Sequence, residues 1–348
     1  MDFSLLERLC QAPGIGGRER AIRDIVRDEL TPLADSIRVD TMGNLIATRN
    51  GSGPRIMIAA HIDEIGFIVR FIDDDGFIRL QPVGGFDARV LVAQRVVVHP
   101  REGDPIPGAL QPGTKPTHLL APGEAKDIKL EDLFVDIGLP AEQVRERVSV
   151  GDMITLERDT VRMGDNIVSK ALDDRLGVYV MIEAVRAAAR GGAEVVAVAT
   201  TQEEVGLRGA TTAAYDVEPD IAIALDVTIA GDIPGMPKDA AVTRLGDGAA
   251  IKVFDSSQIP SQAVIESLRG IAERENIPHQ LEVLPRGGTD AGAIQRSRAG
   301  AFTGTISMPC RYVHTVNETA SVSDIDACVD LLAAFIEQVD LDALRNAQ

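Results

Sequence analysis

The sequence is poor in aromatic residues and in cysteine, and it has no long apolar run. It contains no tryptophan and only three tyrosines among 348 residues, so aromatic platforms for stacking sugar rings are scarce. Three cysteines, none of them in a C-x-x-C pair, are too few and too odd in number for a disulfide framework. No uninterrupted apolar run approaches the roughly 20 residues that span a bilayer, so no membrane partner is expected.

Positive charge is also in short supply. Lysine and arginine number 35 against 53 acidic residues, which gives a net charge of −18. Binding to a phosphate backbone depends on clustered basic residues that release counterions, so no nucleic-acid partner is expected. The first nine residues are amphipathic and carry charges, unlike a secretory signal peptide, and a cytoplasmic location is expected.

Helical and strand patterns alternate in two separate parts of the chain. Helices are expected over 2–11 and 18–34, followed by a hairpin over 36–47 and a short buried strand over 56–64 that carries His61 and Asp63. After Arg162 the alternation resumes. The elements expected there are helices over 173–190, 207–215, 261–275 and 321–337 and strands over 193–201, 220–226, 249–254, 280–284 and 300–306.

Between these parts the composition changes to short Val- and Ile-rich strands with frequent Gly and Pro, which is typical of a small β-barrel or sandwich. The sequence therefore predicts an α/β fold: a three-layer α/β/α domain formed by residues 1–66 and 159–348, interrupted by a β-rich domain over 67–158. Within that domain, Gly108 to Gly123 is expected to have the least regular structure.

Acid and imidazole side chains occur where strand-like apolar runs give way to loops. The candidate metal ligands are His61, Asp173, Glu204, Asp226 and His314. In doubly wound sheets the carboxyl ends of the strands are where ligands collect. Imidazole and carboxylate donors suit zinc, cobalt or manganese. The set predicts a hydrolytic site with two divalent metal ions per chain.

Two further acidic residues stand beside these ligands. Asp63 lies two residues after His61 and therefore on the same strand face, where its carboxylate is expected to accept the second N–H of the imidazole. Glu203 precedes Glu204 and is the expected general base. Consecutive strand side chains point in opposite directions, so the strand must end at or before Glu203 if both glutamates serve one cavity.

Six motifs also occur in a fixed order. They are His61-x-Asp63-Glu64-x-Gly66, Ala171-Leu172-Asp173-Asp174-Arg175, Glu203-Glu204-Val205-Gly206, Leu225-Asp226, Gly287-Gly288-Thr289-Asp290-Ala291-Gly292 and Arg311-Tyr312-x-His314. This set resembles that of the M42 metallo-aminopeptidases, the tetrahedral TET-type peptidases. The resemblance implies release of N-terminal amino acids from peptides by attack of a metal-bridging hydroxide.

The resemblance also implies roles for individual parts of the chain. Asp173 would bridge both ions, with His61 and Asp226 completing one site and Glu204 and His314 the other. Thr289 and Asp290 would contact the substrate. The inserted domain would pack against neighbouring subunits of a homo-oligomer, expected to be a dodecamer.

Three other functions fit parts of the pattern. An amidase or deacylase acting on small N-acyl compounds could use the same site. A glycoside hydrolase is disfavoured by the scarcity of aromatic residues, and a metal-stabilised scaffold or binding protein would not need Glu203. A Cys310–His314 nucleophilic pair is a fourth, minor alternative.

Overall fold

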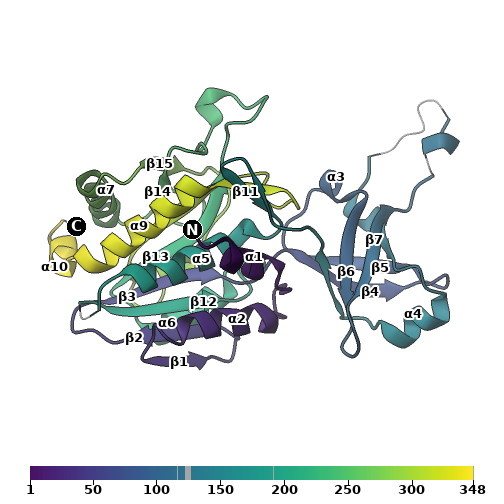
Figure 1. Ribbon diagram of the computed structural model, residues 1–348, viewed down its shortest axis with the longest axis horizontal. Coiled ribbons are helices and arrows are strands. Elements are labelled where there is room, and N and C mark those ends of the chain that lie inside the picture. Colours follow the sequence, from purple (N-terminus) through teal and green to yellow (C-terminus); the bar gives the residue numbers. More distant parts are fainter. Residues whose placement is uncertain (116, 122–126, 191, 348) are drawn as a thin grey trace.

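The computed structural model describes residues 1–115, 117–121, 127–190 and 192–347. Figure 1 shows two parts side by side: a large part in which helices flank a sheet, and a smaller part made of strands. The expected α/β fold with a barrel is confirmed.

Four buried parallel strands form the middle of the large sheet. In spatial order they are β12 (Glu194–Thr200), β3 (Arg55–His61), β13 (Ile221–Ile229) and β16 (Phe302–Arg311). They are almost entirely buried, and β3, β12 and β13 are mostly apolar, as expected for strands that helices cover on both faces. Because they are parallel, their carboxyl ends meet at one edge of the sheet.

Shorter strands extend this sheet on both sides. They are β1 (Ser36–Val39), β2 (Leu45–Arg49), β10 (Val161–Met163), β11 (Asn166–Ser169), β14 (Ala249–Phe254), β15 (His279–Val283) and β17 (Glu318–Ser321). The sequence patterns did not predict β10, β11 or β17. β17 pairs with both β16 and β11 and thereby joins two segments that lie about 140 residues apart in the chain.

Helices cover both faces of the sheet. One face packs against α1 (Phe3–Gln11), α2 (Arg20–Leu30), α5 (Leu172–Ala187), α7 (Gln262–Glu275) and α9 (Val322–Gln338). The other face packs against α6 (Arg208–Val217) and α8 (Asp290–Ile294). The short helix α10 (Leu341–Asn346) follows α9. The buried residues of α5 surround the helix, because α1, α9 and the sheet all pack against it.

The smaller part is a closed barrel inserted between β3 and β10. Its strands, in spatial order, are β4 (Gly66–Ile72), β5 (Ile78–Val83), β8 (Leu133–Asp136), β7 (Ile106–Pro112), β6 (Gln94–His99) and β9 (Met153–Leu156). The short helices α3 (Ala88–Leu91) and α4 (Ala141–Arg147) accompany them. The barrel has its own apolar core, separate from the two cores of the large part.

The stretch from Gly108 to Gly123 is more regular than expected at its start, since β7 continues to Pro112. Thr117–Leu119 forms a 3₁₀ turn, and Pro116, Pro122 and Gly123 lie outside the described residues. Among the residues that the structure describes, no helix is both long enough and apolar enough to cross a bilayer.

Candidate metal centre and active site

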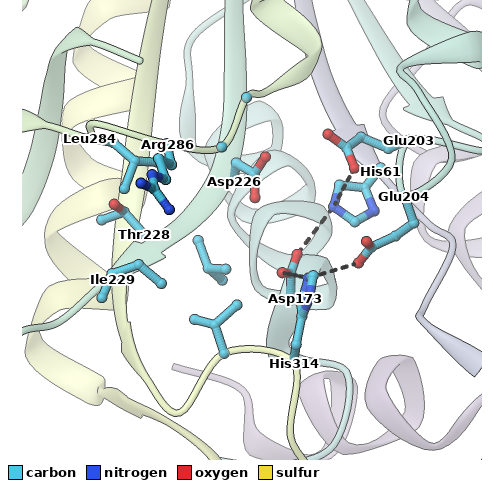
Figure 2. A pocket seen from close by; sticks show the side chains of 14 residues that line it. His61, Asp173, Glu203, Glu204, Asp226, Thr228, Ile229, Leu284, Arg286 and His314 are labelled. Atoms are coloured by element: carbon cyan, nitrogen blue, oxygen red, sulfur yellow. Dashed lines mark hydrogen bonds and ion pairs between the residues drawn. The ribbon is translucent and has the colours of Figure 1, made fainter. Parts of the chain in front are cut away.

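A cavity of about 360 Å³ opens at the carboxyl edge of the parallel strands. All five candidate ligands and Glu203 line it. Figure 2 shows their side chains gathered on one side, facing Thr228, Ile229, Leu284 and Arg286 on the other. Residues in or just after β3, β12, β13 and β16, together with Asp173 at the start of α5, thus meet in one place.

His61 ends β3 and is fixed through both ring nitrogens. Its Nε2 atom lies 3.1 Å from a carboxylate oxygen of Asp173. Its Nδ1 atom lies 3.0 Å from the backbone carbonyl of Asp63, whereas the nearest carboxylate oxygen of Asp63 is 3.7 Å away. The expectation that the Asp63 carboxylate accepts this N–H was therefore wrong. The backbone turns after His61 and brings the carbonyl closer.

The carboxylate of Asp63 has another task. It accepts hydrogen bonds from the backbone N–H groups of Glu203, at 3.0 Å, and Glu204, at 3.3 Å. β12 has already ended at Thr200, so the two glutamates lie in a loop, and both side chains reach the cavity. The expectation that the strand ends before Glu203 is confirmed.

The remaining candidate ligands complete a compact cluster. The Nε2 atom of His314 lies 3.4 Å from an oxygen of Asp173 and 3.4 Å from an oxygen of Glu204 (Figure 2). One ligand atom each from His61, Asp173 and Glu204 lie within 4.8 Å of one another, close enough to take part in a metal centre. Asp226 lies inside β13 and lines the same cavity.

Burial and mutual repulsion shift the pKa values of these groups. Burial, together with nearby carboxylates such as Asp226, raises the pKa of Glu203 well above its usual value. Burial and the charge of Asp173 do the same to the pKa of Asp226. Burial opposes a charge on His314, but its contacts with Asp173 and Glu204 raise its pKa to about 11. The cluster of carboxylates therefore favours a bound proton or cation.

This donor set fits divalent cations. The pKa values of Glu203, Asp226 and His314 are all raised, so without a metal ion these groups tend to bind protons. A divalent cation can supply the positive charge that these protons would otherwise bring. Three carboxylates and two imidazoles are hard and borderline donors of the kind that zinc, cobalt and manganese prefer. No cysteine lines the cavity.

Two predicted substrate contacts do not reach the cavity. Thr289 and Asp290 are 1% and 3% exposed and are absent from the lining, whereas the preceding Gly287 and Gly288 belong to it. The Asp290 carboxylate accepts a hydrogen bond from the Thr200 hydroxyl at 2.5 Å. The side chains of Thr289 and Asp290 therefore lie outside the lining of this cavity, because the chain turns inward into α8 as it leaves it.

The Cys310–His314 pair is also not supported. Cys310 is fully buried within β16, and its thiol points to the backbone carbonyl of Arg311 at 3.5 Å. Burial raises the pKa of this thiol well above its usual value, which disfavours the nucleophilic thiolate.

Sequence reasoning missed two residues around the cavity. Arg286 lines the wall opposite the carboxylates, and among the described residues no hydrogen-bond or ion-pair partner is found for its guanidinium. Glu318 is buried directly behind Asp173 and His314. The only sequence signal for Glu318 was an acidic residue four positions after a candidate ligand.

Solved structures of aminopeptidases share this fold. An aminopeptidase of the archaeon Desulfurococcus kamchatkensis has a TM-score of 0.94 and 40% identity, covering 99% of this chain and 96% of that one. The TET1 peptidase of Pyrococcus horikoshii, described as able to assemble into a tetrahedron or a large octahedral shell, has a TM-score of 0.86 and 33% identity, with 97% and 99% covered.

Sequence similarity gives the family. A protein of Acetivibrio thermocellus, provisionally named an aminopeptidase, is 42% identical over 96% of this chain and 98% of its own length. The profile of the family described as M42 glutamyl aminopeptidase matches residues 43–331. The chain belongs to the M42 family, and it is a hydrolase of the aminopeptidase class.

Proposed function

We propose that this aminopeptidase depends on two divalent metal ions held by the five candidate ligands. The observation that carries the proposal is the convergence of three carboxylates and two imidazoles from five segments on one cavity. Asp173 would serve both ions, because its carboxylate lies beside both histidines, at 3.1 Å from His61 and 3.4 Å from His314.

The other four ligands would divide between the ions. His61 and Asp226 would complete one site. Glu204 and His314 would complete the other, and the Nε2 atom of His314 lies 3.4 Å from a carboxylate oxygen of Glu204. Asp173, Glu204 and Asp226 supply three negative charges against the four positive charges of two ions, so one further negative charge, such as that of a hydroxide, would balance the centre. Zinc and cobalt are the expected ions, with manganese as a third option.

When bound, such ions lower the pKa of a water molecule and polarise the carbonyl of the peptide bond to be cut. Glu203 is the proposed general base. It accepts a proton from the attacking water and returns it to the nitrogen of the leaving amine. Its side chain lines the cavity, 3.9 Å from the Nε2 atom of His61, and its pKa is raised by burial, as suits a group that must both take and give a proton.

Asp63 is proposed to position this base. Its carboxylate holds the backbone N–H groups of Glu203 and Glu204, so the base and a ligand are fixed to the same support. A shift of the loop would move both together. The two neighbouring glutamates can thus keep different tasks in one small cavity.

The opposite wall of the cavity is proposed to receive the first residue of the peptide. It combines the apolar side chains of Ile229 and Leu284 with the hydroxyl of Thr228 and the guanidinium of Arg286. An apolar wall with a few placed polar groups is the usual form of a small-molecule pocket.

Assembly and location are further parts of the proposal. The chain is proposed to form a homo-oligomer, a dodecamer, in the cytoplasm, with the barrel over 67–158 contributing to subunit contacts. The support is the similarity to a TET peptidase that assembles into a tetrahedron. Light scattering coupled to gel filtration tests this, and a mass equal to one chain at micromolar concentration would reject it.

One substrate comparison separates the proposed activity from its rivals. The metal-loaded protein should release p-nitroaniline from amino acid p-nitroanilides with a free amine and leave the matched N-acetyl compounds intact. Cleavage of N-acetyl amino acids with no action on free-amine peptides would instead establish a deacylase. Turnover of an oligosaccharide that survives chelation would support a glycoside hydrolase.

A further inference from the structure

Glu318 joins the backbones of two candidate ligands. It is the first residue of β17 and is 2% exposed. One oxygen of its carboxylate accepts a hydrogen bond from the backbone N–H of Asp173 at 3.0 Å, and the other accepts one from the backbone N–H of His314 at 2.7 Å. Glu318 itself does not line the cavity of the proposed metal centre.

Both N–H groups need an outside partner. Asp173 lies at the start of α5, where its backbone is not helical (φ −77°, ψ 108°), so its N–H has no intrahelical acceptor, and no side chain caps this helix at Ala171. His314 lies in the loop after β16, where both it and Tyr312 have positive φ angles, 63° and 61°. Non-glycine residues rarely hold such angles unless their surroundings fix them. The hydrogen bond from the His314 N–H to Glu318 supports one of these two residues.

The same arrangement occurs once more around the cavity. Asp63 uses its two carboxylate oxygens on the backbone N–H groups of Glu203 and Glu204, as Glu318 does on those of Asp173 and His314. Four of the side chains around the proposed ions are therefore held in two pairs, each by one buried carboxylate.

The two backbone N–H groups use both carboxylate oxygens of Glu318. A glutamine could not replace Glu318, because its amide has only one acceptor oxygen and would direct an N–H at one of the two backbone donors.

We propose that Glu318 is a positioning residue of the metal centre, which sets the separation and direction of Asp173 and His314 before metal binds. This inference rests on the proposed metal dependence. Residues that orient metal ligands typically change metal affinity by about 10- to 100-fold when they are replaced. Replacement of Glu318 by Gln should weaken metal binding by that factor.

Asp324 offers a matched control. It is 1% exposed, and its two oxygens accept hydrogen bonds from the backbone N–H groups of Gly246 and Gly248, at 2.8 and 2.9 Å. These glycines do not line the cavity. Asp324→Asn therefore makes the same chemical change, from a carboxylate that accepts two backbone N–H groups to an amide, away from the proposed ligands.

The experiment titrates the metal-free full-length proteins with cobalt in competition with a chelator and records the visible spectrum of the bound ion. Glu318→Gln should bind cobalt about 10- to 100-fold more weakly, with an altered spectrum. Asp324→Asn should match the wild type in both readouts, even if both variants melt at lower temperature. Glu318→Asp, which keeps the charge on a shorter side chain, should give an intermediate affinity.

Wild-type affinity and spectrum in Glu318→Gln would overturn the inference, as would equal weakening in Asp324→Asn. Failure of both Glu318 variants to fold would also overturn it, because Glu318 would then serve the fold and not the ligand geometry. A wild-type protein that binds no cobalt would reject the proposed function itself.

Discussion

The Nε2 atom of His61 lies 3.1 Å from a carboxylate oxygen of Asp173, although 112 residues separate them in the chain. β3 ends at His61, and α5 begins at Leu172. The contact therefore joins the end of a central strand to the start of the most buried helix. It places the carboxylate of Asp173 where one side chain can reach both histidines.

Replacement of Asp173 by Ala should remove both metal ions and abolish peptidase activity. The reason is that its carboxylate is assigned to both ions, so no complete site remains. Metal analysis of the purified variant beside the wild type measures this. Retention of one tightly bound ion per chain would show that the bridging ligand lies elsewhere.

Glu203 and Glu204 should respond differently to the same substitution. Glu203→Gln should keep both ions and the fold while lowering kcat by on the order of 10²–10⁴, the usual contribution of a positioned general base. Glu204→Gln should first lose metal, because a neutral amide is a poor ligand. Metal content and kinetics are measured on both variants, and the reverse pattern would exchange their roles.

Arg286 should select for a negatively charged first residue. Its guanidinium lines the cavity, has no partner among the described residues, and is free to bind a substrate carboxylate. Loss of one charge-assisted hydrogen bond weakens binding by roughly 10- to 100-fold. Arg286→Ala should therefore lower kcat/KM for a glutamyl substrate by about that factor. It should lower kcat/KM for a leucyl substrate much less.

Arg296 is the control for this prediction, because it is exposed and lines a different surface cavity. Arg296→Ala should leave the ratio of glutamyl to leucyl turnover unchanged. Equal losses on both substrates in Arg286→Ala would mean that Arg286 supports the cavity without reading the substrate's charge.

The positions of the residues around the cavity were only partly predictable from the sequence. His61, Glu203 and Glu204 were found because apolar runs end beside them, and parallel strands of one sheet must end at a common edge. The task of Asp63 was misread, because the turn after β3 decides whether its carbonyl or its carboxylate faces His61. Strand spacing does not encode that turn.

The positions of Glu318, Thr289 and Asp290 were not predictable, because contacts between distant segments set them. β17 has four residues, too few for a periodic pattern, and its place is set by pairing with β11 and β16. Gly287 and Gly288 of the glycine-rich loop line the cavity, whereas Thr289 and Asp290 do not. The direction in which the chain leaves that loop depends on packing of α8, which the local sequence does not specify.

Asp290 should make folding stability depend on pH. Burial raises its pKa to about 6 from an ordinary value of 3.8, although the hydrogen bond from Thr200 opposes part of the rise. The folded state therefore holds this proton more tightly than the unfolded state, and stability falls as the pH rises from about 4 to about 6.

Asp290→Asn should remove this fall in stability, because asparagine does not ionise. The free energy of unfolding of the metal-free variant, relative to metal-free wild type, should rise over this pH range by up to about 3 kcal/mol. Urea unfolding at several pH values measures it. A difference that stays constant with pH would show that Asp290 titrates normally in the folded protein.

Metal titration of the chelated protein tests metal dependence, the central claim, most directly. Protein freed of metal should release no p-nitroaniline from a free-amine substrate, and activity should return as cobalt or zinc is added, reaching a plateau at two ions per chain. Full activity in protein shown by elemental analysis to be free of metal would contradict the account.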